Sequence, residues 1–404
     1  MRSLAVLAVL GLLLASAPSA PAQPRLPKAN IKIVSSLPRT GSAKAQTDTI
    51  VNGIKMALEE AGHKAGDFAI VYEDLDDATA AEGKWTPEKE AANAELALKD
   101  PDVMVYIGTY NSGAAKVSIP KLNKDNLVMI SPANTWPGLT KPGKGEAGEP
   151  DKYYPNGKRN YCRVVPADDM QGPVGADWAK KLGMRRVFII DDREVYGKGI
   201  ADLFQARAEE IALKVVGREG IDASQQEFKA LMVKVKAAEP DMVYFGGTTQ
   251  TKAGQIAKDL VGSGSKAKIM VPDGCFEDEF IKSAGADNLN DRCYVTFGGL
   301  PPSKLTGKGR TFVENYQKRF GGEPEGYAVY GYEAAKVALD GIARAGKKDR
   351  EAIRAAVFAT KNFDGALGKW SFDKNGDTTL RTMSGQKVQG GKFEFMTLLG
   401  DDAD

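Results

Sequence analysis

Residues 104–140 read MVYIGTYNSGAAKVSIPKLNKDNLVMISPANTWPGLT. Two short apolar runs, 104–107 and 127–130, each end in small and hydroxyl-bearing residues. Between them, residues 114–122 have the spacing of a helix. Apolar runs of this length joined by a helix are typical of a βαβ unit with parallel strands. The stretch therefore predicts an α/β fold.

The same alternation continues on both sides of this stretch. Because it occurs twice, with a second set beginning after Pro166, it indicates two similar α/β lobes, each built on a parallel sheet. An acidic turn is predicted at 73–77, and an exposed loop at 138–160, which is rich in Gly, Pro and Lys. The remaining predicted strands are 31–34, 68–72, 186–190, 213–216, 241–245 and 268–271, and the remaining predicted helices are 49–61, 87–99, 177–182, 196–211, 228–238, 254–261, 311–319 and 331–345.

Length and charge limit the classes of protein that fit. A chain of 404 residues suggests two domains or one two-lobed unit. The net charge is only +2, from 55 basic and 53 acidic residues. This balance provides no electrostatic footprint for nucleic acid or for a membrane surface. We therefore expect no nucleic-acid partner.

The amino terminus has the pattern of a secretory signal. Arg2 is followed by an apolar run at 4–17, and Ala20 and Ala22 are small residues at the −3 and −1 positions of a cleavage site. The apolar run is too short to span a bilayer. Residues 1–22 are thus predicted to be a cleaved signal peptide, and the mature protein is expected in a bacterial periplasm.

Three cysteines occur in the chain: Cys162, Cys275 and Cys293. An odd number in an exported protein indicates one disulfide and one buried thiol. Cys275 and Cys293 enclose a short loop and are the preferred pair. The alternative is three buried thiols that pack as small apolar groups.

The sequence contains partial matches to cofactor and metal motifs, but none has the sequence context that such a site requires. Residues 143–148 match G-x-G-x-x-G, but no strand precedes them, so no pyrophosphate site is expected there. Residues 373–377 resemble the start of a calcium loop but lack its downstream carboxylate. The single histidine, His63, lies in a polar stretch. No enzyme activity, cofactor or metal is therefore expected.

The two strand ends of the opening stretch predict a binding site. In open α/β sheets, ligands sit at the carboxyl ends of the strands. Small residues there let a ligand approach the backbone, and Ser112 and Thr135 add hydroxyl donors suited to a small carboxylate. Alternatively, Ser112 only caps a helix and Thr135 only shapes a turn.

Several motifs follow one another in a fixed order over nearly the whole mature chain: LPRTGSAKAQTDTIVNGIKMALEEA, DPDVMVYIGTYNSGAAKVSIP, LVMISPANTWPGLT, RVVPADDMQG, VFIIDDREVYGKG, PEGYAVYGYEAAKVALDGIARAG and FDGALGKWSFDKNGD. With these motifs the chain resembles the periplasmic solute-binding proteins of branched-chain amino acid ABC transporters, the Leu/Ile/Val-binding proteins of the type I fold. The resemblance implies two Rossmann-like lobes joined by a three-crossing hinge. One lobe is expected to comprise 30–165 plus 299–373, and the other 166–298 plus 374–400.

The resemblance also implies roles for particular residues. Ser112 and Thr135 would hold a ligand carboxylate, and the carbonyl of Ala133 would accept from its ammonium group. In the second lobe, Tyr196 would cover the ligand and Asp273 would pair with the ammonium. Alternatively, Asp273 is a turn residue before a glycine.

Departures from the family pattern concern the ligand's side chain. Asn134 stands where an apolar residue is usual, and Thr248 where an aromatic residue is frequent. Asp273 is shorter than the usual Glu. Tyr110 and Trp136 are available to line a pocket for an aromatic or larger ligand.

The function that the resemblance implies is capture of a small ligand, expected to be an amino acid of the branched-chain type, and its delivery to an ABC transporter permease in the inner membrane. One alternative is a binding protein for a non-amino-acid ligand such as an amide or an aromatic carboxylate. The others are a two-lobed α/β enzyme and the ligand-sensing domain of a receptor.

Overall fold

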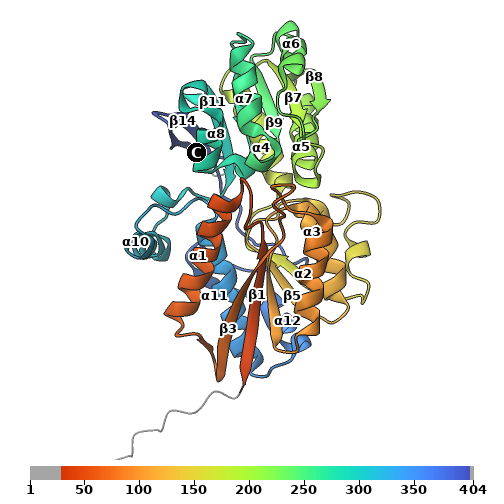
Figure 1. Cartoon of the computed structure of the whole chain (residues 1–404), viewed down its shortest axis with the longest axis vertical. Coiled ribbons are helices and arrows are strands. Elements are labelled where there is room, and N and C mark those ends of the chain that lie inside the picture. The colour runs from red at the N-terminus through yellow and green to blue at the C-terminus, as the bar shows by residue number, and fades with distance from the viewer. Residues whose placement is uncertain (1–28, 401–404) are drawn as a thin grey trace, which may run out of the picture.

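The computed structural model describes residues 29–400, which form two α/β lobes stacked end to end (Figure 1). The predicted signal peptide, residues 1–22, lies outside the described part of the chain. No helix within residues 29–400 combines the length and the apolar composition needed to cross a bilayer.

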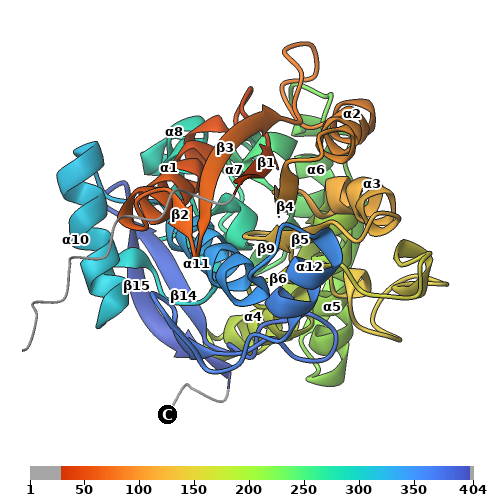
Figure 2. The same ribbon diagram turned by 90° about the horizontal axis from the view of Figure 1, so that it is seen from below.

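The sheet of the first lobe has the strand order β2-β3-β1-β4-β5-β6 and is parallel except for the pair β2–β3. Its central strand β4 (Val103–Gly108) is buried along its whole length, because helices cover both faces of the sheet. Figure 2 shows α2 and α3 on one side of the strands and α11 and α12 on the other. The other strands are β1 (Asn30–Leu37), β2 (Lys64–Ala65), β3 (Phe68–Asp76), β5 (Val128–Ser131) and β6 (Tyr161–Arg163).

The sheet of the second lobe has the order β15-β14-β11-β10-β9-β7-β8. Strands β7 to β11 are parallel, and the hairpin β14–β15 adds two antiparallel strands at one edge. The bounds are β7 (Arg186–Asp191), β8 (Lys214–Gly220), β9 (Met242–Gly246), β10 (Lys268–Val271), β11 (Cys293–Gly298), β14 (Met383–Gln389) and β15 (Lys392–Leu399).

The helices complete both lobes. Their bounds are α1 (Lys44–Glu60), α2 (Pro87–Lys99), α3 (Ser112–Asn123), α4 (Asp168–Lys181), α5 (Val195–Glu210), α6 (Lys229–Ala237), α7 (Ala253–Gly262), α8 (Asp278–Ala284), α9 (Ala286–Leu289), α10 (Lys308–Phe320), α11 (Ala328–Ala345) and α12 (Arg350–Phe358). A short hairpin, β12 (Phe363–Gly365) with β13 (Gly368–Trp370), follows α12.

Helix α11 belongs with the first lobe although it comes late in the chain. It packs closely on α1, and glycines permit the contact: a Cβ at Gly53 would lie 2.2 Å from the carbonyl oxygen of Ala328, and one at Gly331 would lie 2.3 Å from that of Ile50. The chain therefore leaves the first sheet after β6, returns after β11, and passes back to form β14.

The predicted alternation of strands and helices is confirmed, with local corrections. Helix α1 begins at Lys44 rather than at residue 49, and residues 73–76 of the predicted acidic turn belong to β3. Helix α4 begins at Asp168 rather than at 177. The hairpin β14–β15 was not predicted, because Ser, Gly, Gln and Lys interrupt any apolar run in β14.

The prediction of an exposed loop at 138–160 is only partly correct. Tyr153, Tyr154 and Asn160 are buried within it. The loop folds around Glu149, whose Oε2 accepts hydrogen bonds from Nε1 of Trp136 and from the amide of Glu146, both at 2.9 Å. These bonds satisfy polar groups that would otherwise need water, so part of the loop can be buried.

The predicted disulfide between Cys275 and Cys293 is wrong, because all three cysteines are free and buried. Cys293 opens β11 and is in register with Ile269 in the neighbouring parallel strand β10. Cys275 lies beyond the carboxyl end of β10, where its thiol is 3.5 Å from the carbonyl oxygen of Gly247. No bond joins the two thiols, and each is buried in its own packing environment.

Candidate functional site

The predicted site residues of the first lobe lie at two neighbouring strand ends. Tyr110 and Ser112 follow β4, and Ala133 and Thr135 follow β5. The parallel pairing of these strands brings both ends to the same edge of the sheet. The two loops are joined, since the amide of Trp136 donates to Oγ of Ser112 at 3.3 Å.

The predicted site residues of the second lobe lie at the facing sheet edge. Thr248 follows β9, Asp273 follows β10, and Tyr196 is in the first turn of α5. All three are buried. Helix and strand ends from both lobes thus meet at one seam.

A small cavity of about 20 Å³ lies in this seam. Five of the predicted residues line it: Tyr110, Ser112, Ala133, Tyr196 and Thr248. The other lining residues are Asn111, Gly274 and Tyr327. A cavity of this size holds about one water molecule, so the two lobes are closed on each other.

Asp273 lies beside the cavity and is held by hydrogen bonds from both lobes. The hydroxyl of Tyr196 donates to Oδ1 and that of Tyr327 to Oδ2. The amide of Gly274 donates to Oδ1 at 3.1 Å. Burial raises the pKa of Asp273, and the two tyrosine hydroxyls partly offset that rise.

Thr135 and Asn134 do not line the cavity. Asn134 locks the two strand-end loops together, since its Nδ2 donates to the carbonyl oxygen of Tyr110 at 3.0 Å. It also accepts from the hydroxyl of Tyr161 at 3.3 Å. Oγ1 of Thr135 is buried and has no hydrogen-bond partner among the described residues. Of these two residues, only Thr135 has a side-chain group without a hydrogen-bond partner.

Asp168 is a buried acid that sequence reasoning did not assign to the site. It opens α4, its amide donates to the carbonyl oxygen of Thr135 at 2.9 Å, and its Oδ2 has no hydrogen-bond partner within residues 29–400. Burial and then the charge of Asp273 raise its pKa well above the usual range. The hydroxyl of Thr135 makes no hydrogen bond of acceptable geometry to Asp168, but it lies close enough to lower this pKa. The adjacent Asp168 and Asp169 after a proline were a possible signal in the sequence.

Tyr327, Asn111 and Gln46 are further site residues that sequence reasoning missed. The hydroxyl of Tyr110 donates to Oε1 of Gln46, and the rings of Tyr110 and Tyr327 meet edge to face at 6.2 Å. Tyr327 comes just before α11, far along the chain from the other first-lobe residues. No local pattern in the sequence links it to them.

Direct contacts close the seam around the cavity. Nε2 of Gln46 donates to the carbonyl oxygen of Phe276 at 3.2 Å. Nearer the rim, Lys84 and Glu194 form an ion pair at 3.0 Å.

Trp136 also crosses the seam, and it packs against helix α5. A Cβ at Gly199 would lie 2.4 Å from Cζ3 of the Trp136 ring. Only glycine at this position therefore permits the close approach.

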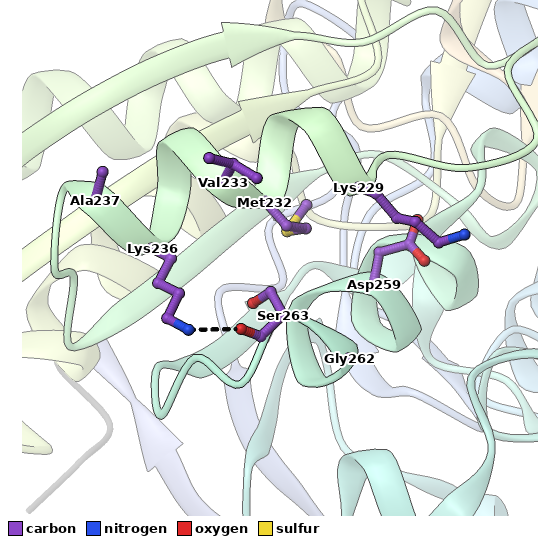
Figure 3. Close-up of a pocket in the computed structure, with 8 residues that line it drawn as sticks. All are labelled: Lys229, Met232, Val233, Lys236, Ala237, Asp259, Gly262 and Ser263. Atoms are coloured by element: carbon purple, nitrogen blue, oxygen red, sulfur yellow. Dashed lines mark hydrogen bonds between the residues drawn. The ribbon is translucent and has the colours of Figure 1, made fainter.

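A larger groove of about 630 Å³ lies elsewhere, between α6 and α7 (Figure 3). Met232 and the exposed Val233 are among the residues that line it, and Nζ of Lys236 donates to the carbonyl oxygen of Ser263 at 2.9 Å. Figure 1 shows these helices at the outer end of the second lobe, away from the seam. The groove contains none of the predicted site residues and is formed by one lobe alone.

The chemistry of the seam is that of recognition. It offers hydroxyl groups from Ser112 and Thr135 and two buried acids, Asp168 and Asp273. The charge of Asp273 raises the pKa of Asp168, so a cation near the two acids would help both to ionise. The chain's single histidine, His63, is exposed in the turn after α1, so no imidazole is available here as a base.

These features define the class of the protein: two α/β lobes that close over a buried polar site, as in solute-binding proteins. A sequence profile of the family described as "Periplasmic binding protein" matches residues 30–392. The match covers most of the chain, and the protein therefore belongs to this family.

Individual relatives agree with this assignment. The Leu/Ile/Val-binding protein BraC3 of Rhizobium johnstonii is 28% identical, with 91% of this chain and 94% of that protein covered. A crystal structure of the leucine-binding protein LivK from Thermotoga maritima has a TM-score of 0.82 at 27% identity and covers 92% of this chain and 99% of that one.

The isoleucine-bound LivJ of Streptococcus pneumoniae shares the fold, with a TM-score of 0.78 at 24% identity over 90% of this chain and 98% of that one. The resemblance stated from the sequence motifs, and the two-lobed type I fold it implied, are confirmed.

Proposed function

We propose that the protein captures a free amino acid between its lobes and delivers it to an ABC importer. The observation that carries the proposal is the buried acid Asp273, which accepts hydrogen bonds from Tyr196 and Tyr327, two residues that line the cavity together with Ser112. A second buried acid, Asp168, lies near enough for the charge of Asp273 to raise its pKa. An amino acid supplies an ammonium group for the acids and a carboxylate for the hydroxyls. Relatives named as Leu/Ile/Val-binding proteins support an amino-acid ligand.

The acids give the proposal a physical basis. Burial raises the pKa of both Asp168 and Asp273, so it opposes their ionisation. An ammonium ion between them provides the positive charge that lets them ionise, and a charge-assisted hydrogen bond is about twice as strong as a neutral one. Ligand binding would thus favour the closed state.

The lobes would act as a hinged clamp, with one lobe made of 30–165 plus 299–373 and the other of 166–298 plus 374–400. The cross-lobe contacts of Lys84, Gln46 and Trp136 support closure as a rigid-body movement. In this proposal the mature protein works in the periplasm, binds no nucleic acid, catalyses no reaction, and docks on a permease in the inner membrane.

A second candidate ligand class is an aromatic carboxylate. Three tyrosines, Tyr110, Tyr196 and Tyr327, line the cavity and offer faces and edges for an aromatic ring. This ligand would use the hydroxyl wall but leave the acid pair without a cation, so an amino acid fits better.

A thermal-shift screen of the mature protein against amino acids, amides and aromatic acids, followed by calorimetry, tests the proposal. An amino acid is expected to raise the melting temperature, because a ligand that binds only the folded state stabilises it. Stabilisation by aromatic acids, with none by any amino acid, would refute it.

A further inference from the structure

A second group of polar side chains adjoins the cavity and has no assigned role. We call Asn111, Thr249, Gln250 and Glu277 the distal cluster. Five of their side-chain atoms are buried without a hydrogen-bond partner among the described residues: Oδ1 of Asn111, Oγ1 of Thr249, Nε2 of Gln250, and both carboxyl oxygens of Glu277. The side chain of Glu277 is wholly enclosed.

The distal cluster is continuous with the candidate site. Asn111 lines the cavity, and its Nδ2 donates to Oε1 of Gln250 at 3.0 Å. Thr249 follows the cavity residue Thr248. Its hydroxyl makes no hydrogen bond of acceptable geometry to Glu277, but it lies close enough to lower the pKa of that acid. After burial, Glu277 is the strongest influence on the pKa of Tyr110, whose ring lines the cavity.

Closure of the lobes buries this cluster. Asn111 comes from the first lobe, whereas Thr249, Gln250 and Glu277 come from the second. Buried polar groups in folded proteins are almost always hydrogen bonded. One water molecule, which is all that the cavity of about 20 Å³ accommodates, makes two to four hydrogen bonds and so leaves part of the cluster unpaired.

The balance of acceptors and donors among these five atoms indicates which chemical group could bind to them. Three of the five are acceptors, on Asn111 and Glu277, and one, Nε2 of Gln250, is a donor. The nearby acid Glu325 adds negative character, since its charge raises the pKa of Glu277. A ligand group with several N–H donors can form hydrogen bonds with these acceptors, whereas an alkyl group can form none.

We propose that the distal cluster is a specificity subsite for an amino acid whose side chain ends in a nitrogen donor, either a carboxamide or a basic group. The proposal rests on the amino-acid function proposed above. In the closed complex the side-chain nitrogen donates to Glu277 and Asn111. A leucine-type side chain in the same position leaves these acceptors buried and unpaired.

Calorimetry on the mature protein tests this subsite with three sets of ligands: leucine, isoleucine and valine; asparagine and glutamine; and ornithine, lysine and arginine. We expect a nitrogen-bearing ligand to bind most tightly. Glu277→Gln should weaken its binding about tenfold or more, because a charge-assisted hydrogen bond is lost. The same substitution should change leucine binding less than about threefold.

Two further variants distinguish a direct effect on ligand binding from a loss of folded protein. Gln250→Ala removes a less buried member of the cluster and should weaken the same ligand, whereas Asp278→Asn, at an exposed acid next to Glu277, should leave its binding unchanged. Tightest binding of leucine, isoleucine or valine, with equal losses for all ligands in Glu277→Gln, would overturn the subsite while leaving the amino-acid function intact. Binding of no amino acid at all would overturn both.

Discussion

Tyr327 and Asp273 belong to different lobes and are joined by a hydrogen bond from the tyrosine hydroxyl to Oδ2 of the acid. Tyr327 precedes α11, which packs on α1 in the first lobe, and Asp273 follows β10 in the second. Tyr196 occupies the other carboxyl oxygen. The acid that is proposed to hold the ligand's ammonium group therefore also accepts a hydrogen bond that joins the two lobes.

Tyr327→Phe should shift the ligand-free protein toward an open form, because it removes one cross-lobe hydrogen bond to a buried acid. The expected result is a larger radius of gyration in small-angle scattering without ligand. Tyr316→Phe is the matched control, since the hydroxyl of Tyr316 accepts from Asn52 within the first lobe. Superimposable scattering curves for the two variants would show that the hydrogen bond between Tyr327 and Asp273 does not hold the lobes together.

Asp273→Asn should weaken amino-acid binding by about 10- to 100-fold, since it removes the charge that faces the ammonium group. Ser112→Ala should weaken it less, because neighbouring backbone amides still serve the ligand carboxylate. Calorimetry with the ligand found by the screen measures both. If Asp273→Asn binds as tightly as the parent protein, Asp273 does not hold the ligand's ammonium group.

Gly199→Ala should hinder closure without unfolding either lobe. The added methyl group meets the ring of Trp136 at 2.4 Å, so the lobes must stay slightly apart. We expect an affinity loss of about tenfold, because fewer molecules reach the closed state. The loss is measured by calorimetry.

Gly262→Ala is the control for this substitution. Gly262 is also in a helix, and a Cβ there meets nothing within 4 Å. Equal affinities for the two variants would exclude a role for the contact between Trp136 and Gly199.

Glu149→Gln should reduce stability at neutral pH but not in strong acid. Burial opposes ionisation of Glu149, but bonds from Lys116, Tyr153, the amide of Glu146 and Trp136 outweigh it and lower the pKa to about 2. A carboxyl pKa below its unfolded value of 4.5 stabilises the fold above pH 4.5, and this stabilisation is lost as the pH falls toward 2.

Urea unfolding of parent and variant between pH 7 and pH 2.5 measures the effect. The stability difference should be largest at pH 7 and shrink steadily below about pH 4.5. A difference that stays constant across this range would show that the charge of Glu149 has no part in it.

Asp377→Asn should destabilise the protein by about 3–5 kcal/mol, because it leaves a buried guanidinium without its counter-charge. Nε of Arg163 lies 2.6 Å from Oδ1 of Asp377, and both side chains are almost fully buried. Arg163 also donates to the carbonyl oxygen of Trp136 at 2.9 Å, so the pair supports the loop that crosses the seam.

Asp364→Asn, which breaks an exposed ion pair with Lys308, is the control for the buried pair and should change stability far less, because water screens the exposed charges. Denaturant midpoints of the two variants give the comparison. Similar losses in both would contradict the importance of the Arg163–Asp377 pair.

Local sequence patterns were sufficient to predict the α/β alternation and the candidate positions at the strand ends. Apolar runs such as 104–107 are local signals, since hydrophobic periodicity depends only on neighbouring residues. Ser112 and Thr135 were found because they follow such runs, and the structure places them after β4 and β5. Tyr196 and Asp273 came from the family resemblance.

Which of these residues meet, and what surrounds them, depends on how the whole chain packs. Chain spacing favoured a bridge between Cys275 and Cys293, but both thiols are free and buried in the folded protein. The hairpin β14–β15 depends on pairing with β11, about 85 residues earlier, rather than on its own composition.

The acids Asp168 and Glu277 and the tyrosine Tyr327 became site candidates only when the fold brought them to the seam. Burial and the absence of a partner are properties of the closed pair of lobes. They arise because side chains from distant parts of the chain exclude water together, which no local pattern of residues encodes.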